Sequence, residues 1–374
     1  MRDLAVQKQT VKSAEVLCMV QAAQICIIIP ERNEKSSIRT CLDAVLAQDY
    51  PQSLISILVV DGLSSDGTRE ILAEYEGKYP FIEVIESPRK VVPVGFNMAM
   101  HRTRADIIIR VDGHTVIAPD YVRQCVETLH RTQADNVGGK MNAIGTTRFG
   151  RGVAFATSTP FGVGGSRFHY SNQEEWVDTV YMGAWPRQVF ERIGLFDEEL
   201  VRDQDDEFNY RLREYGGRIL LSPSIHSQYT VRSTPLALIR QYWGYGYWKV
   251  RVLQKHPLQM CTRQFIPPLF VLALLLSALL FLASSFALSS SFAVFAPTLR
   301  GLSMVIPISY VIANLLASFW TAGRRDWNSL PWLPLIFAIL HLSYGLGFLV
   351  GLLKFAHRSG DRLGRTPSLA SRDA

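Results

Sequence analysis

Three long apolar segments in the last third of the chain constrain its fold more than any other feature. They cover about residues 265–288, 302–320 and 332–353, and each is close to the ~20 residues that a helix needs to cross the hydrocarbon layer of a membrane. Buried helices of one soluble domain are the alternative, but segments of this length with so few charges favour membrane-spanning helices. The sequence therefore predicts a transmembrane region of about three helices within residues 264–355.

Basic residues and the N-terminus indicate how the chain is oriented. Basic residues precede the first apolar segment, and Arg324 and Arg325 lie between the second and the third, which favours a cytoplasmic location for both regions. The N-terminal extension, residues 1–24, lacks the apolar block and cleavage site of a signal peptide. We therefore expect a multi-pass protein of the inner, cytoplasmic membrane with its N-terminal domain in the cytoplasm. The basic tail, residues 356–374, would lie outside after three crossings, so its side of the membrane stays open.

The charged residues point to a membrane surface rather than to nucleic acid. The chain has 39 Lys and Arg against 33 Asp and Glu, a net charge of +6. This mild excess suits anionic lipids and phosphate-bearing substrates, and we expect no nucleic-acid partner. Residues 236–263 interleave Tyr242, Trp243, Tyr247 and Trp248 with arginines and lysines. This mixture predicts an amphipathic helix at the membrane–water interface.

Residues 25–235 alternate short apolar runs with amphipathic helical patterns. The runs that read as buried strands cover residues 25–30, 57–60 and 107–111. Such alternation predicts an α/β domain with a mostly parallel sheet, helices on both faces, and ligands outside the carboxyl ends of the strands. Asp61 and Asp112 each follow such a run directly. A glycine-rich stretch, residues 138–165, is expected to form a mobile loop.

The triplet Asp112-Gly113-His114 follows the third strand and carries two side chains that can bind metal. On an extended segment, side chains two residues apart point to the same side. Asp112 and His114 can therefore bind one hard divalent ion that also contacts phosphate oxygens. The alternative is that Asp112 caps the following turn. Asp61 also ends a strand, where its carboxylate can accept hydrogen bonds from a nucleobase or a ribose.

Acidic residues cluster at the start of a helix predicted over about residues 205–215. Asp205, Asp206 and Glu207 occupy its first turn, and Arg211 follows one turn later. The dipole of the helix favours anions at this end, and one of the carboxylates can act as a general base for a hydroxyl nucleophile. A charged, solvated first turn is the alternative, and composition by itself favours it.

Four motifs, in this order and spacing, resemble those of family 2 glycosyltransferases. They are residues 29–34, 60–68, 111–114 and 205–211. The match covers roughly residues 25–256, with the closest likeness to the succinoglycan-biosynthesis glucosyltransferase branch. The resemblance implies an inverting transferase with the GT-A fold and a nucleoside-diphosphate sugar as donor. It suggests UDP-glucose as that donor and a divalent metal, Mg or Mn, as cofactor.

The resemblance also implies which residues bind the nucleoside. Pro30, Arg32, Glu34 and Asp61 would line its pocket. Arg32 stands where many relatives stack a tyrosine on the base, and a guanidinium can replace that ring.

The remaining motifs supply the expected metal ligands and the base. Asp112 would bind the donor as the first acid of the family's DxD motif, while His114 stands where a second aspartate is commoner; imidazole is a competent ligand. His226 resembles a late histidine that binds metal in some relatives, although a structural role is equally open. Asp205 corresponds to the aspartate that serves as catalytic base, with Gln204 in place of the usual glutamate.

These observations predict an enzyme that transfers a single sugar, glucose from UDP-glucose, to a lipid-diphosphate-linked saccharide in exopolysaccharide biosynthesis. The stretch Arg240-Gln241-Tyr242-Trp243 is only loosely similar to the QxxRW motif of processive polysaccharide synthases, which favours single transfer. A processive synthase and a catalytically inactive membrane scaffold that keeps the fold are the alternatives.

Overall fold

The computed structural model describes residues 23–259, 261–287, 293–358, 360 and 366–369. Most of the expected N-terminal extension and part of the basic tail lie outside the described residues. The chain forms two compact units. The sheet unit comprises residues up to 142, residues 171–229 and the segment from 365 onward, and the helical unit comprises residues 143–170 and 230–364.

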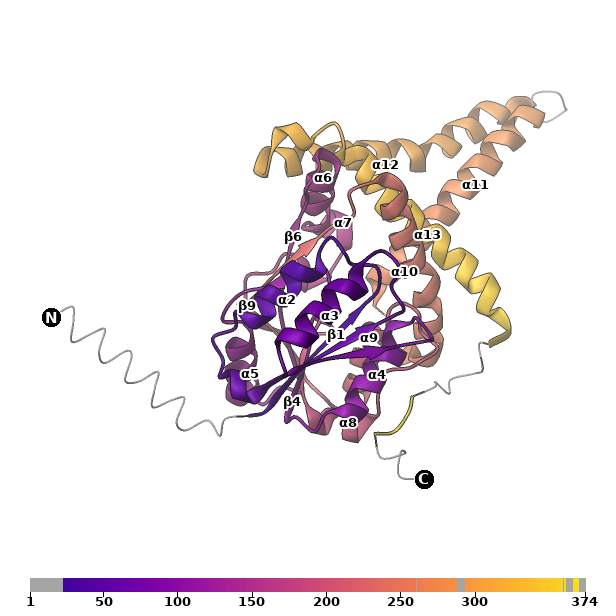
Figure 1. Ribbon diagram of the computed structural model, residues 1–374. Helices are drawn as coiled ribbons and strands as arrows, with labels where there is room; N and C mark the ends of the chain where they lie inside the picture. The colour runs from indigo at the N-terminus through magenta and orange to yellow at the C-terminus, as the bar shows by residue number, and fades with distance from the viewer. Residues whose placement is uncertain (1–22, 260, 288–292, 359, 361–365, 370–374) are drawn as a thin grey trace. The chain divides into compact units, whose positions relative to one another are not determined.

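The first half of the sheet is built from parallel strands (Figure 1). β1 (Ile25–Glu31) lies between β2 (Ile55–Asp61) and β4 (Ile107–Arg110), and β3 (Ile82–Glu86) follows at the edge. Isoleucine and valine dominate β1, β2 and β4, as expected of strands buried on both faces. The three predicted strands are confirmed, and their carboxyl ends meet at one edge of the sheet.

The second half of the sheet is antiparallel, so the sheet as a whole is mixed. β8 (Ala184–Pro186) joins β4 to β6 (Asn136–Ile144), and β9 (Ile219–Thr230) and β5 (Thr115–Ile117) follow in the strand order. β7 (Glu175–Val177) pairs with β9. β5 does not lie beside β4 but pairs with β9; residues 111–114, which connect β4 to β5, are too few for the helical crossover that parallel neighbours require.

Helices cover both faces of the sheet (Figure 1). α2 (Ile38–Leu46), α3 (Thr68–Lys78) and α5 (Tyr121–Thr132) share one hydrophobic core with alternate residues of β1. α4 (Val92–Arg102), α8 (Arg187–Ile193) and α9 (Gln204–Glu214) contribute to a second core, which is aromatic. Its rings are those of Phe96, Trp185, Phe190, Phe196 and Phe208.

The glycine-rich stretch, residues 138–165, is not the expected mobile loop. It contains most of β6 and two helices, α6 (Arg148–Thr157) and α7 (Pro160–Val163). Its glycines allow close packing, since a Cβ on Gly139 would lie 1.7 Å from the carbonyl oxygen of Ile225. Thr147 caps α6 by accepting a hydrogen bond of 2.9 Å from the backbone of Gly150. The prediction is wrong because glycine serves backbone contact here rather than flexibility.

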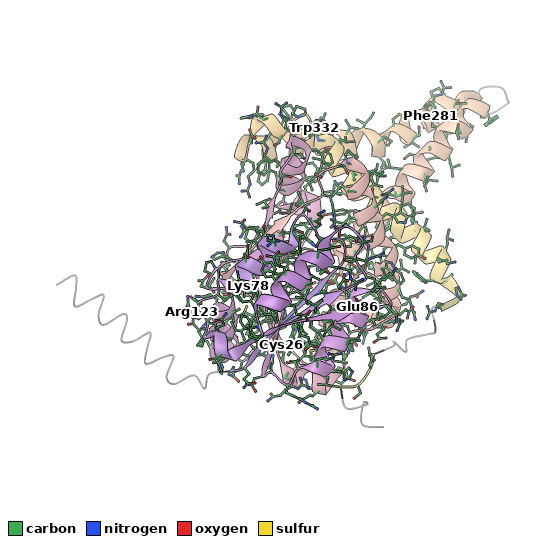
Figure 2. The ribbon with its side chains drawn as sticks, in the orientation of Figure 1. Cys26, Lys78, Glu86, Arg123, Phe281 and Trp332 are labelled. Carbon is green, nitrogen blue, oxygen red and sulfur yellow. The ribbon has the colours of Figure 1, made fainter. Side chains whose placement is uncertain are left out.

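The helical unit contains the long helices. α10 (Pro235–Lys255) lies where an interfacial helix was predicted, and the three apolar segments form α11 (Ile266–Ala287), α12 (Ala296–Arg324) and α13 (Leu333–Phe355). Three helical stretches are long and apolar enough to cross a membrane: Thr262–Phe286, Ala296–Arg324 and Leu333–Arg358. α11 and α12 lie side by side (Figure 1). Apolar side chains such as Phe281 are exposed on α11 (Figure 2), as expected of a helix that faces lipid.

α10 packs along α13 through glycines. A Cβ on Gly347 would lie 2.2 Å from the carbonyl oxygen of Trp243, and one on Gly351 would lie 2.6 Å from that of Tyr247. Small residues allow helix backbones to approach this closely. α10 is therefore bound to a candidate membrane helix, and its location at the bilayer surface stays a prediction.

Candidate active site

The carboxyl ends of β1 and β2 hold two of the predicted motifs against each other. Glu31 and Asp61, the last residues of these strands, lie opposite each other in the parallel register. Hydrogen bonds tie the loops that follow: Asn33 Oδ1 accepts from Ser65 N at 2.9 Å, and Asn33 N donates to Ser64 Oγ at 2.7 Å. The two loops are therefore tied directly to each other.

Glu31 and Asp61 form a buried pair of carboxyl groups. Their exposed fractions are 6% and 1%, and Asp61 Oδ1 accepts a hydrogen bond of 2.9 Å from Ser64 N. Burial, and then the hydrogen bond and negative charge of Asp61, raise the pKa of Glu31 to about 9. Glu31 thus keeps its proton at neutral pH, and the sequence motifs did not indicate this pairing.

The other residues predicted for the nucleoside pocket lie around this pair in different ways. Pro30 is buried within β1. Arg32 is exposed, and its side chain lies over Gly62, where an added Cβ would be 3.2 Å from Arg32 Cδ. Glu34 follows in the same loop, but its carboxylate contacts His114. Arg32 therefore lies beside the loop that follows Asp61, while Glu34 joins the motif at the end of β4.

Asp112 and His114 each contact a charged partner. Arg110 Nε donates to Asp112 Oδ1 at 2.8 Å. His114 Nδ1 lies 3.0 Å from Glu34 Oε1, and its ring packs edge-on against Tyr229 with centroids 5.2 Å apart. A carboxylate that holds one ring nitrogen of a histidine orients the other, an arrangement typical of metal-binding histidines. The backbone here is a turn, in which Thr115 N donates to Asp112 O at 2.9 Å, rather than the extended segment expected from the sequence. The donor set, a carboxylate and an imidazole, fits a divalent ion.

His226 is not grouped with these two residues. It is exposed on β9, and Tyr229, which contacts His114, lies three residues further along the strand and so on the opposite face. Among the residues that the structure describes, no three His, Cys, Asp or Glu side chains converge around a metal site. An ion bound by Asp112 and His114 would take its other ligands from substrate and water.

The first turn of α9 presents acidic side chains with different surroundings. Glu207 is buried and binds Arg211 through two hydrogen bonds of 2.9 and 3.0 Å. Asp206 Oδ1 accepts a hydrogen bond of 3.1 Å from Thr179 Oγ1. Asp205, the predicted base, is partly exposed, and its Oδ1 accepts from Asp206 N at 3.0 Å.

Arg110 is a buried cation that interacts with two of the predicted site residues. Burial lowers the pKa of its guanidinium, but the charges of Asp112 and then Asp205 raise it above its usual value. Asp205, at the start of α9, and Asp112, after β4, thus both interact electrostatically with the same guanidinium. The motifs did not reveal Arg110. The signal that could have done so is a single charge in the otherwise apolar run 107–111.

Comparison with known proteins identifies the family. The model of glycosyl transferase family 2 matches residues 26–194, which include the loops after β1, β2 and β4 and end before α9. The chain is 28% identical over 339 residues to the succinoglycan biosynthesis protein ExoA of Rhizobium meliloti, covering 89% of this chain and 96% of the relative.

A second relative and a solved structure are also glycosyltransferases by name. The chain is 30% identical over 239 residues to the dolichyl N-acetyl-alpha-D-glucosaminyl phosphate 3-beta-D-2,3-diacetamido-2,3-dideoxy-beta-D-glucuronosyltransferase of Methanococcus voltae, covering 62% of this chain and 74% of the relative. The mannosyltransferase PcManGT from Pyrobaculum calidifontis, solved in complex with GDP-Man and Mn2+, has a TM-score of 0.54 at 17% identity and 88% coverage of both chains.

The domain has the GT-A fold of nucleotide-sugar transferases, with a mixed sheet and a site at the ends of its strands. The chain belongs to glycosyl transferase family 2 and is a glycosyltransferase with relatives in exopolysaccharide and lipid-linked saccharide synthesis. The fold and family expected from the four motifs are confirmed. The roles of individual residues stay predictions.

Proposed function

We propose that the protein transfers a single sugar from a nucleoside-diphosphate sugar to a lipid-diphosphate-linked saccharide in exopolysaccharide biosynthesis. UDP-glucose is the donor that we expect. The observation that carries the proposal is the convergence of the Glu31–Asp61 pair, the Glu34–His114 pair and the Arg110–Asp112 pair at one edge of the sheet. The similarity to the succinoglycan biosynthesis protein over nearly the whole chain supports the choice of pathway.

The donor would lie across the loops that follow β1, β2 and β4. Asp61 would accept hydrogen bonds from the base or the ribose, with Pro30 and Arg32 lining the nucleoside pocket. Asp112 would bind the diphosphate side. Glu34, predicted for the nucleoside pocket, contacts His114 at 3.0 Å, so we assign it the additional role of orienting that imidazole.

The reaction would be a direct displacement with inversion at the anomeric carbon. Asp205 would take the proton of the acceptor hydroxyl. A bond forms between that oxygen and the anomeric carbon while the bond from this carbon to the diphosphate oxygen breaks, and the diphosphate departs with the electron pair.

A divalent ion, Mg or Mn, would be held by Asp112 and His114 and would neutralise charge on the diphosphate. Oxygen from a carboxylate suits both ions, and imidazole nitrogen is acceptable to Mn. The predicted third ligand, His226, lies exposed on the opposite face of β9 from Tyr229, which does not support its role. Chelation should abolish transfer, and full activity in excess chelator would remove the metal from the proposal.

The acceptor would be presented by the membrane. Three helices are long and apolar enough to cross it, and the helical unit has many basic residues but no acidic ones besides Asp326 and Asp361. Such a charge balance suits the anionic surface of the cytoplasmic leaflet. We therefore propose a cytoplasmic catalytic domain, residues 25–235, followed by an interfacial segment, 236–263, and a membrane region, 264–355, in the inner membrane.

The experiment is transfer in vitro. The purified protein is incubated with a membrane lipid extract and separately with UDP-glucose, UDP-galactose and GDP-mannose, and the lipids are analysed by mass spectrometry. We expect a single hexose added with UDP-glucose. A ladder of products would favour the processive synthase instead. If neither sugar transfer nor hydrolysis of the donor occurs with any of the three donors, the inactive scaffold is favoured.

A further inference from the structure

Arg110 is the last residue of β4 and its only charged residue, after three isoleucines. The residue is 6% exposed. A guanidinium buried in this way costs free energy unless its donors are paired. Its presence at the end of an apolar strand, directly beside the predicted site, therefore needs a physical reason.

The backbone and one side-chain nitrogen of Arg110 are both fixed. Its N donates to Gly183 O at 3.1 Å, and it lies opposite Ile28 in the parallel register. Val111 N donates to Ile28 O at 3.0 Å, which continues the extended backbone toward Asp112. Side chains two residues apart on such a backbone point to the same side. The bond of 2.8 Å from Arg110 Nε to Asp112 Oδ1 thus runs from the last residue of β4 to the loop that follows it, where Thr115 N donates to Asp112 O at 2.9 Å.

The second carboxylate oxygen of Asp112 and the buried Nη1 of Arg110 have no hydrogen-bond partner within the described part of the chain. Asp112 Oδ2 accepts no hydrogen bond from the described residues, so it is the carboxylate oxygen left for a ligand. Arg110 Nη1 is buried, and within the described part of the chain it has no hydrogen-bond partner. Asp205 interacts with the guanidinium through charge. Arg110 therefore acts on the residues of the site rather than on the packing of helices.

We propose that Arg110 is a positioning residue that holds the Asp112 carboxylate in the orientation that binds the donor diphosphate together with its divalent ion. This inference rests on the proposed function, in which Asp112 faces the diphosphate. Without Arg110, Asp112 can rotate about its side-chain bonds and its free oxygen loses a fixed direction. The nucleoside pocket around Asp61 is built from other strands and loops, so it keeps its shape.

Binding measurements on the full-length protein in detergent test the proposal. Uridine and UDP are titrated, with and without Mn2+, into the wild type, Arg110→Met and Arg110→Lys by calorimetry; guanosine and GDP replace them if the donor is a guanosine sugar. Lysine keeps the charge but not the geometry of the guanidinium. We expect the affinity for UDP with Mn2+ to fall about 10–100-fold in both variants, as after loss of other ligand-orienting partners. The affinity for uridine should not change.

A double mutant shows whether Arg110 acts through Asp112. Arg110→Met combined with Asp112→Asn should bind UDP no more weakly than Asp112→Asn alone, because residues that act as one unit are not additive. The matched control is Arg187→Met. Arg187 is 11% exposed and pairs with Glu191 at 3.2 Å, but it lies at the opposite end of β4, where its N donates to Asp106 O. This control should bind UDP like the wild type.

Three results would overturn the inference. They are wild-type affinity for UDP in Arg110→Lys, equal losses of uridine and UDP binding in that variant, and additive effects in the double mutant. If Arg110→Met does not fold, the UDP and uridine affinities of Arg110→Lys are sufficient to test the inference. Absence of sugar transfer by the wild type would instead reject the proposed function.

Discussion

The acidic residues of α9 are alike in composition but differ in their contacts. Glu207 is bound by Arg211, and Asp206 accepts a hydrogen bond from Thr179. Asp205 interacts through charge with Arg110, which also holds Asp112. Asp205 therefore stays the proposed base because of the spacing of the motif, and these contacts show how its surroundings differ from those of Asp206 and Glu207.

Replacement of Asp205 tests this choice directly. Asp205→Asn keeps the shape of the side chain but cannot take a proton, so turnover should fall about 10²–10⁴-fold while the affinity for UDP stays near that of the wild type. Initial rates with the preferred donor and calorimetry with UDP measure the two effects. Asp206→Asn is the matched control and should keep most activity. The reverse result would move the base by one residue.

Glu31 makes the stability of the sheet unit depend on pH. Its pKa is about 9 in the folded protein against an ordinary value of 4.5. Its favourable contribution is therefore complete below about pH 4.5. It is lost as the pH rises toward 9, because over this range the unfolded chain releases a proton that the folded protein retains.

A glutamine at this position removes the titration. The Tm of Glu31→Gln should therefore rise relative to that of the wild type between about pH 5 and about pH 9, measured by tryptophan fluorescence without nucleotide. Glu70→Gln, on the exposed side of α3, is the control and should follow the wild-type profile. A difference in Tm between Glu31→Gln and the wild type that is constant with pH would contradict the assignment.

At the scale of elements, the contact between α10 and α13 depends on glycines that leave no room for a side chain. Gly347→Ala would place a methyl group 2.2 Å from Trp243 O, and such overpacking typically costs about 1–3 kcal/mol. We expect a lower Tm in detergent. Gly301→Ala is the control, since nothing lies within 4 Å of its Cβ position and alanine favours a helix. Equal Tm values for the two variants would show that the helices do not pack in this way.

At the scale of the whole molecule, the C-terminal segment bears on the membrane topology. It belongs to the sheet unit, where Leu195 N donates to Pro367 O at 3.0 Å. The sequence around it is basic, with Lys354, Arg358, Arg362 and Arg365, and basic residues next to membrane helices favour the cytoplasm. We therefore expect the C-terminal segment on the same side of the membrane as the N-terminal domain, which requires an even number of crossings.

The candidate helix that does not cross would be α13. Half of its apolar window is buried within the protein, against 17% for the windows of the other two candidates. This arrangement would also remove the conflict between the basic tail and three crossings, because the tail would then lie in the cytoplasm.

Protease treatment of intact cells tests this topology. Residues 25–256 and a tag fused after residue 374 should both be protected, whereas a tag inserted between α11 and α12 should be cleaved from outside. Cleavage of the C-terminal tag together with protection of residues 25–256 would indicate three crossings. Cleavage within 25–256 would reject the cytoplasmic orientation.

Local patterns along the chain were sufficient to predict the helices and strands and the positions of the motifs relative to them. Long apolar segments must form helices in a membrane, because their backbone groups have no other partners there. Apolar runs that end at Asp61 and Asp112 place those carboxylates at the edge of a parallel sheet wherever the sheet forms. These properties depend on neighbours along the chain, so the sequence alone determined them.

Only the tertiary structure decided which of these residues act together. Glu34 contacts His114 across 80 positions of the chain, the Glu31–Asp61 pair depends on the register of two strands, and His226 is exposed on the face of β9 away from His114. The glycine-rich stretch forms packed elements because a distant backbone lies against it. Such contacts join residues far apart in sequence, and burial raises the pKa of Glu31, so no local pattern encodes them.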